Sequence, residues 1–164
     1  MIIVDTGFWV ALFNDKDQYH QSAQQTWAQY PQQPLITTWC VLTESSHLLL
    51  KRSSSTYQGV EKQIKLMDVF QKYQEKFKLF NLEPIHLERI KLLMKQYQNL
   101  PMDWADASLV ILAEDLGHGR IFSVDQRDFN TYRWKQTYPF ENLLIRWIKR
   151  LNEDWKTITK LRSQ

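Results

Sequence analysis

The chain opens with Met1-Ile2-Ile3-Val4-Asp5-Thr6-Gly7, a four-residue apolar run that ends at a carboxylate and a turn. Short apolar runs bounded by turn residues are typical of buried strands, so we predict a strand over residues 1–4. The next apolar stretch, residues 8–13, fits a short helix, with the Thr6 hydroxyl as its expected cap. A strand that leads directly into a helix favours an α/β sheet whose edge carries Asp5.

Strands and helices alternate through the rest of the sequence. We predict strands at 35–38, 80–82 and 121–124, helices at 18–30, 39–52, 59–78, 84–97 and 103–116, an irregular segment at 129–139 and a final long helix. This alternation predicts an α/β fold with a central parallel sheet.

Composition narrows the class of protein. At 164 residues the chain fits a single domain, and its 4 glycines argue against a Gly-rich phosphate loop and against a turn-rich all-β fold. Cys40 is the only cysteine, which excludes an internal disulfide and a multi-cysteine zinc site. No apolar stretch reaches the ~20 residues of a membrane span, and the N-terminus does not resemble a signal peptide. We therefore expect a cytoplasmic protein without a membrane partner.

Charge is distributed unevenly. Residues 133–164 hold 8 Lys/Arg and 3 Asp/Glu, whereas residues 1–132 hold 13 and 15. An acidic body with a basic C-terminal segment suits a polyanionic substrate whose phosphates meet the basic segment while carboxylates hold a metal ion. A basic helix that is merely solvated is the alternative.

Four carboxylates lie at positions where an open sheet could gather them. Asp5 and Asp125 end predicted strands, and Glu44 and Asp106 lie on predicted helices. Such sheets bind ligands at the carboxyl ends of their strands. Clustered carboxylates repel one another, and a hard divalent cation with oxygen ligands, usually Mg²⁺, removes that repulsion. The sequence thus predicts an acidic metal site.

Each carboxylate also has a structural interpretation. Asp5 could cap the helix that follows it, Asp125 could be a loop residue, and Glu44 could form a salt bridge at the rim of an apolar helix face. Asp103 after Pro101 fits a helix N-cap, which leaves Asp106 in the first turn as the favoured ligand. Asp128 is a possible fifth acid.

Other chemistries find little support in the sequence. It contains no glycine–lysine phosphate loop and no serine nucleophile elbow. A phosphatase of the haloacid dehalogenase type needs a second Asp two residues after the first, where this chain has Gly7. Cys40 and the tryptophans are expected to be core residues.

Taken together, these motifs resemble the PIN domain, and more narrowly the VapC-type toxin ribonucleases of bacterial toxin–antitoxin pairs. The resemblance covers about residues 1–144. It rests on the order of four stretches: residues 1–8, Thr43-Glu44 on a helix, residues 102–109 with Asp103 and Asp106, and residues 122–129 with Asp125.

The resemblance implies a three-layer α/β sandwich, a central parallel sheet with helices on both faces. It implies a divalent-metal-dependent endoribonuclease with an RNA substrate, an antitoxin partner and a homodimeric assembly. The carboxylates that would coordinate Mg²⁺ or Mn²⁺ and position the attacking water are Asp5, Glu44, Asp106 and Asp125. Supporting roles would fall to Thr6, Ser123, Asp103 and Asp128. A PIN-like module that binds RNA or protein without cutting is the alternative.

The last segment, residues 145–164, departs from the family by being longer and more basic than expected. Apolar residues recur in it at three- and four-residue steps, so we predict a basic amphipathic helix that packs on the nuclease domain of residues 1–144 or on a partner. A tail that only completes the core is the alternative. The stripe consists of Leu144, Trp147, Ile148, Leu151, Trp155, Ile158 and Leu161.

Overall fold

The computed structural model describes residues 1–144, which form a five-stranded sheet in the order β3-β2-β1-β4-β7. All four strand pairings are parallel, which confirms the predicted parallel sheet. The strands are β1 (Ile2–Val4), β2 (Leu35–Thr38), β3 (Phe77–Phe80), β4 (Arg120–Phe122) and β7 (Glu141–Asn142). The predicted helix and basic stripe of residues 145–164 lie outside the described residues.

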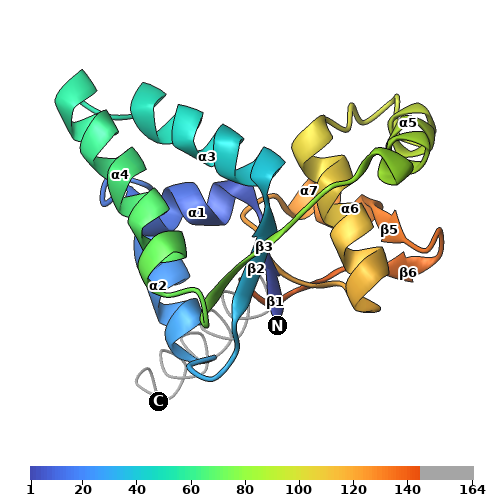
Figure 1. Ribbon diagram of the computed structural model, residues 1–164, viewed down its shortest axis with the longest axis horizontal. Helices are drawn as coiled ribbons and strands as arrows, with labels where there is room; N and C mark the ends of the chain where they lie inside the picture. Colours follow the sequence, from blue (N-terminus) through green and yellow to red (C-terminus); the bar gives the residue numbers. More distant parts are fainter. Residues whose placement is uncertain (145–164) are drawn as a thin grey trace, which may run out of the picture.

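Helices cover both sides of this sheet, as the predicted three-layer sandwich requires. Helices α1 to α4 lie on one side and α5 and α6 on the other (Figure 1). The helices are α1 (Thr6–Phe13), α2 (His20–Ala28), α3 (Trp39–Lys51), α4 (Thr56–Lys72), the 3-10 helix η1 (Pro84–His86), α5 (Leu87–Gln96), α6 (Trp104–Leu116) and α7 (Gln126–Thr131). No helix of residues 1–144 is long and apolar enough to cross a membrane.

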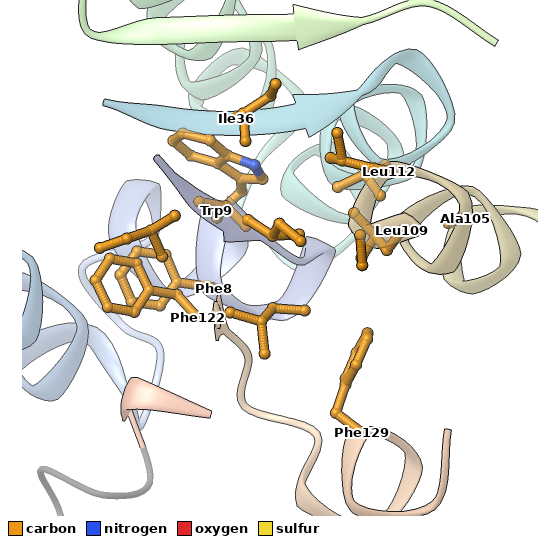
Figure 2. Packing of buried hydrophobic residues seen from close by; sticks show 14 of the residues in the cluster. Phe8, Trp9, Ile36, Ala105, Leu109, Leu112, Phe122 and Phe129 are labelled. Carbon is orange, nitrogen blue, oxygen red and sulfur yellow. The ribbon is translucent and has the colours of Figure 1, made fainter. Parts of the chain in front are cut away.

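The core lies between the sheet and the two helix layers. All three residues of β1 are fully buried, as expected for a central parallel strand covered on both faces. Phe8 of α1 stacks on Phe122 of β4 with ring centroids 4.6 Å apart, and Leu109 and Leu112 of α6 pack on the other side (Figure 2). This packing holds α1 and α6 against the sheet.

The helix predicted over residues 59–78 is shorter and begins earlier. It is α4, whose start is capped by Ser55, and residues 77–80 leave it to form β3 beside β2. The weak strand predicted at residues 80–82 therefore lies three residues earlier. Pairing with a neighbouring strand outweighs local helix propensity here.

The segment predicted to be irregular, residues 129–139, contains part of α7 and an antiparallel pair, β5 (Arg133–Trp134) and β6 (Tyr138–Pro139). Its turn places Lys135 and Gln136 at positive φ, 44° and 64°. Non-glycine residues rarely adopt this conformation, and Lys and Gln are not typical of such turns, so the sequence does not predict this one. Residues 141–142 were predicted to be helical, which is wrong, because they form strand β7.

Candidate active site

Asp5 stands at the end of β1, where the chain turns into α1. Its Oδ1 accepts a hydrogen bond of 2.6 Å from the Thr6 backbone N–H, and its Oδ2 accepts one of 2.8 Å from Ser123 Oγ. Asp5 is thus the N-cap of α1, and the prediction that the Thr6 hydroxyl caps this helix is wrong. Asp5 is only 6% exposed.

The Thr6 hydroxyl does not cap α1 and instead contacts the carboxylate of Glu44. Thr6 Oγ1 donates a hydrogen bond of 2.6 Å to Glu44 Oε2 on α3. Within residues 1–144 Glu44 is not among the acids that form salt bridges, so the rim salt bridge is not observed. Thr6 therefore connects the start of α1 with α3 through Glu44, which is half-buried.

Of the two acids at the start of α6, Asp103 is the N-cap, as the sequence predicted. Asp103 Oδ1 accepts a hydrogen bond of 2.9 Å from the Asp106 N–H, which makes Asp103 the exposed N-cap of α6. The Asp106 side chain is left free of capping. Its Oδ2 accepts a hydrogen bond of 3.0 Å from the hydroxyl of Tyr132.

Asp125 follows β4 and caps α7 by accepting a hydrogen bond of 2.9 Å from the Asp128 N–H. Its own N–H donates to Ser123 Oγ over 2.9 Å. Asp128 is paired with Arg127 at 2.8 Å. Asp128 therefore has a cationic partner, and Asp125 is held next to Ser123 and Asp5.

Burial and like charges dominate the electrostatics of this region. Burial raises the pKa of Asp5 to about 7, and the charges of Glu44 and Asp125 add to the rise, although hydrogen bonds from Ser123 and Thr6 oppose it. Burial also raises the pKa of Asp106 to about 8, helped by the charges of Asp5 and Asp103. The charge of Asp5 thus interacts with those of Glu44, Asp125 and Asp106, so the four predicted acids lie in one region.

The donor set fits a hard cation in its chemistry. It consists of carboxylate and hydroxyl oxygens, and none of the four acids forms a salt bridge in the described part of the chain. However, no three His, Cys, Asp or Glu side chains of residues 1–144 are grouped as a preformed ligand set. Mg²⁺ typically keeps several waters and contacts only one or two carboxylates directly, which suits such an arrangement.

Sequence reasoning missed Tyr132, the residue that contacts Asp106. Its side chain is fully buried, and its ring packs edge-on against Tyr97 and Phe129. Burial and the neighbouring Asp106 raise the pKa of its phenol, which stays protonated and donates to the carboxylate. The residue lies after α7 in a segment predicted to be irregular, where no sequence pattern marks it.

A pocket of about 680 Å³ opens between α3 and the start of α6, directly beside Glu44. Two tryptophans in it correct the expectation that tryptophans are core residues, since Trp39 is 55% exposed and Trp104 is 50% exposed. Cys40 is half-buried in the same wall, and burial raises the pKa of its thiol.

Comparison with known proteins agrees with this architecture. The family model of the PIN domain matches residues 2–135. The fold is similar to the crystal structure of Mycobacterium tuberculosis VapC20, a sarcin-ricin loop cleaving toxin, with a TM-score of 0.68 and 21% sequence identity over 78% of this chain and 92% of that one. A search of curated protein sequences gave no match. The family match spans most of the chain, and the chain belongs to the PIN domain family.

Proposed function

We propose that this protein is a divalent-metal-dependent endoribonuclease, the toxin of a type II toxin–antitoxin pair. The observation that carries the proposal is the grouping of acids around the buried Asp5: Ser123 joins it to Asp125, Thr6 joins it to Glu44, and its charge acts on Asp106. Repulsion among buried acids destabilises the fold unless a cation offsets it, so a cluster of this kind favours metal binding. Mg²⁺ or Mn²⁺ is the expected ion.

The chain's own residues have distinct tasks in this proposal. Asp5 and Asp106 would hold the metal together with Glu44 and Asp125. Ser123 and Thr6 orient these carboxylates, since Ser123 donates to Asp5 and Thr6 donates to Glu44. When bound, the ion would stabilise charge on the phosphate and lower the pKa of a bound water.

The fold likeness supports RNA as the substrate class. VapC20 is described as a sarcin-ricin loop cleaving toxin, and its fold covers most of this chain. As the resemblance to the VapC-type toxins implies, we further expect a cognate antitoxin protein that blocks the site, and a homodimeric assembly. A small neighbouring gene for a DNA-binding antitoxin, and co-purification of its product with this chain, would test the pairing.

Cleavage of single-stranded RNA by the purified full-length chain tests the activity. We expect cleavage in Mg²⁺ or Mn²⁺, and none in EDTA. Asp5→Asn and Asp106→Asn should each abolish cleavage while the variants remain folded. Asp115→Asn is the matched control, because Asp115 is an exposed acid at the opposite end of α6.

Three outcomes would contradict the proposal. Cleavage that persists in EDTA would exclude metal dependence. Cleavage that persists in both site variants would exclude the assigned carboxylates. Metal-independent RNA binding without any cleavage would favour the non-cleaving binding module instead.

A further inference from the structure

We propose that the pocket between α3 and α6 is a nucleobase-stacking subsite for the nucleotide next to the cleaved phosphodiester. The inference rests on the proposed ribonuclease function and adds a substrate-binding site to it. The pocket is lined by Trp39, Cys40, Glu44, His47, Asp103 and Trp104, among others. Glu44 belongs to both the pocket and the candidate metal site, so the two are continuous.

The two walls of the pocket each present an indole ring. Trp39 is the first residue of α3 and Trp104 the first residue of α6. Residues 1–144 contain five tryptophans, and these two are the exposed ones. Single exposed apolar side chains are common, but exposed apolar side chains gathered in one groove are typical of ligand-binding sites, and here both exposed rings line the same hollow.

Trp39 is also oriented. Its indole Nε1 donates a hydrogen bond of 3.0 Å to Asn81 Oδ1, in the loop after β3. The ring is therefore held by a polar anchor at its edge while about half of its surface stays accessible. An aromatic ring fixed in this way offers a stacking platform at little entropic cost.

Buried hydroxyls hold the two walls together. Thr38 Oγ1 and Ser108 Oγ lie 2.6 Å apart and connect the N-cap of α3 with the first turns of α6. Ser108 also donates to the Ala105 carbonyl at 2.6 Å, and Thr38 accepts from the Val41 N–H at 3.3 Å. Thr38 is thus the donor to Ser108, each hydroxyl is satisfied, and the separation of the helix starts is fixed.

The chemistry of the lining favours a base over a phosphate. The part of the chain that the structure describes places no Lys or Arg in this pocket, and it contributes the carboxylates of Glu44 and Asp103. Carboxylates accept hydrogen bonds from base amino groups, and tryptophan stacks on the face of any base. The volume of about 680 Å³ lies within the usual range for small-ligand sites.

A cationic peptide is the competing occupant, because arginine also stacks on indoles and pairs with carboxylates. Continuity with the candidate metal site favours the base. An RNA strand whose phosphate lies at the four acids has to place a neighbouring base within one nucleotide of Glu44. The experiment therefore compares an RNA probe with an arginine-rich peptide.

Binding of a fluorescein-labelled single-stranded RNA is measured by anisotropy with the full-length chain, in Mg²⁺ and in an Asp106→Asn background that prevents cleavage. Trp39→Ala and Trp104→Ala should each weaken binding at least about fivefold, as expected for loss of one stacked base. Trp39→Phe and Trp104→Phe should restore most of the affinity. Tyr73→Ala is the matched control, since Tyr73 is 56% exposed and lies at the end of α4, outside this pocket.

A second probe carries an abasic ribose at each position in turn. At one position the abasic RNA should bind the unsubstituted protein as weakly as the alanine variants bind intact RNA. The alanine variants should bind this abasic RNA no more weakly than they bind intact RNA. Unchanged RNA affinity in folded Trp39→Ala and Trp104→Ala variants would overturn the subsite. The subsite would also be overturned if these variants lost affinity for the arginine-rich peptide but kept their affinity for RNA.

Failure of the proposed function has a separate signature. It appears as absent or EDTA-resistant cleavage by the unsubstituted chain. The binding series is read independently of cleavage, so it judges the subsite in either case.

Discussion

Ser123 donates a hydrogen bond of 2.8 Å to Asp5 although 118 residues separate them in the chain. The same hydroxyl accepts from the Asp125 N–H, so one buried group joins two of the candidate ligands. The contact spans the carboxyl ends of β1 and β4, which are parallel neighbours. The strand order reverses here. Strands β2 and β3 lie on one side of β1, whereas β4 and β7 lie on its other side. Open α/β sheets bind ligands at such a point.

Loss of the Ser123 hydroxyl should weaken both the fold and metal binding. Ser123→Ala removes a hydrogen bond to a charged group, worth about 1.5–3 kcal/mol when Asp5 is ionised. Because that bond opposes the rise in the pKa of Asp5, its loss should raise that pKa further. Urea unfolding at pH 9 and Mg²⁺ titration by calorimetry measure the two effects.

Ser45→Ala is the control for Ser123→Ala. Ser45 is equally buried, but its hydroxyl donates only to the Val41 carbonyl within α3. It should cost stability without changing Mg²⁺ affinity. Equal Mg²⁺ affinities for Ser123→Ala and the unsubstituted protein would contradict the role given to Ser123.

The metal-free protein should lose stability as the pH rises from about 4 to about 8. The pKa of Asp5 is raised from 3.8 to about 7 and that of Asp106 from 3.8 to about 8, so the folded state binds more protons than the unfolded state across this interval. The free energy of unfolding then falls with pH by up to about 1.4 kcal/mol per pH unit for each group. Urea unfolding in EDTA at several pH values measures the slope.

Two controls separate this effect from the titration of other groups. Asp5→Asn keeps an oxygen that can cap α1 but cannot ionise, so it should reduce the slope and stabilise the metal-free protein at pH 8. Saturating Mg²⁺ should also flatten the slope, because it binds the ionised carboxylates. A metal-free stability that rises from pH 5 to pH 8 would contradict the assignment.

The central part of the fold was predictable because its signals are local. The apolar runs of β1, β2 and β4 and the cap at Asp103 with Gly117 after α6 can be read within a few residues. The pairing of β7 with β4 and the β5–β6 turn depend on contacts made only in the folded chain, and no glycine marks that turn.

The same distinction applies to the site. Asp5 and Asp125 were singled out because they follow strands, and Glu44 and Asp106 because they lie on helices. Their role as metal ligands remains a prediction. Tyr132 and the exposed rings of Trp39 and Trp104 were missed, because an aromatic residue that serves a site and one that fills the core have the same sequence pattern. The dual role of Asp5, cap and candidate ligand, also emerges only from the structure.

Tyr132→Phe should weaken metal binding with little loss of stability. The substitution removes the hydroxyl that donates to Asp106 over 3.0 Å but keeps the ring that packs against Tyr97 and Phe129. This hydrogen bond lowers the pKa of Asp106, so its loss should raise that pKa and disfavour the ionised ligand. We expect Mg²⁺ affinity at pH 7 to fall about tenfold, which corresponds to about 1.4 kcal/mol of binding free energy, close to the value of one hydrogen bond to a charged group.

Raising the pH provides the control for Tyr132→Phe. At pH 9 a much larger share of the Asp106 carboxyl is ionised in both proteins than at pH 7, and the difference in Mg²⁺ affinity should narrow. A deficit of equal size at pH 7 and pH 9 would indicate that the hydroxyl acts through geometry alone. No deficit at either pH would remove Tyr132 from the site.

Gly7→Ala should damage the candidate site through a steric contact. A Cβ at Gly7 would lie 2.2 Å from Val124 Cγ2, and Val124 stands between Ser123 and Asp125. We expect the loop after β4 to move away from the start of α1 and to stretch the Ser123–Asp5 hydrogen bond. We expect a cost of about 1–3 kcal/mol, as for overpacking elsewhere, and a loss of RNA cleavage per folded molecule.

Two variants test whether the contact with Val124 is the cause. Val124→Ala added to Gly7→Ala removes the obstructing methyl groups and should restore cleavage. Gly117→Ala also destabilises, by about 1–2 kcal/mol, because Gly117 has φ +70°, but a Cβ at this position would meet no atom within 4 Å and would be remote from the four acids. It should leave cleavage per folded molecule unchanged. A Gly7→Ala protein that cleaves normally, or a double variant that stays inactive, would show that close packing of α1 against the β4 loop does not set the geometry of the site.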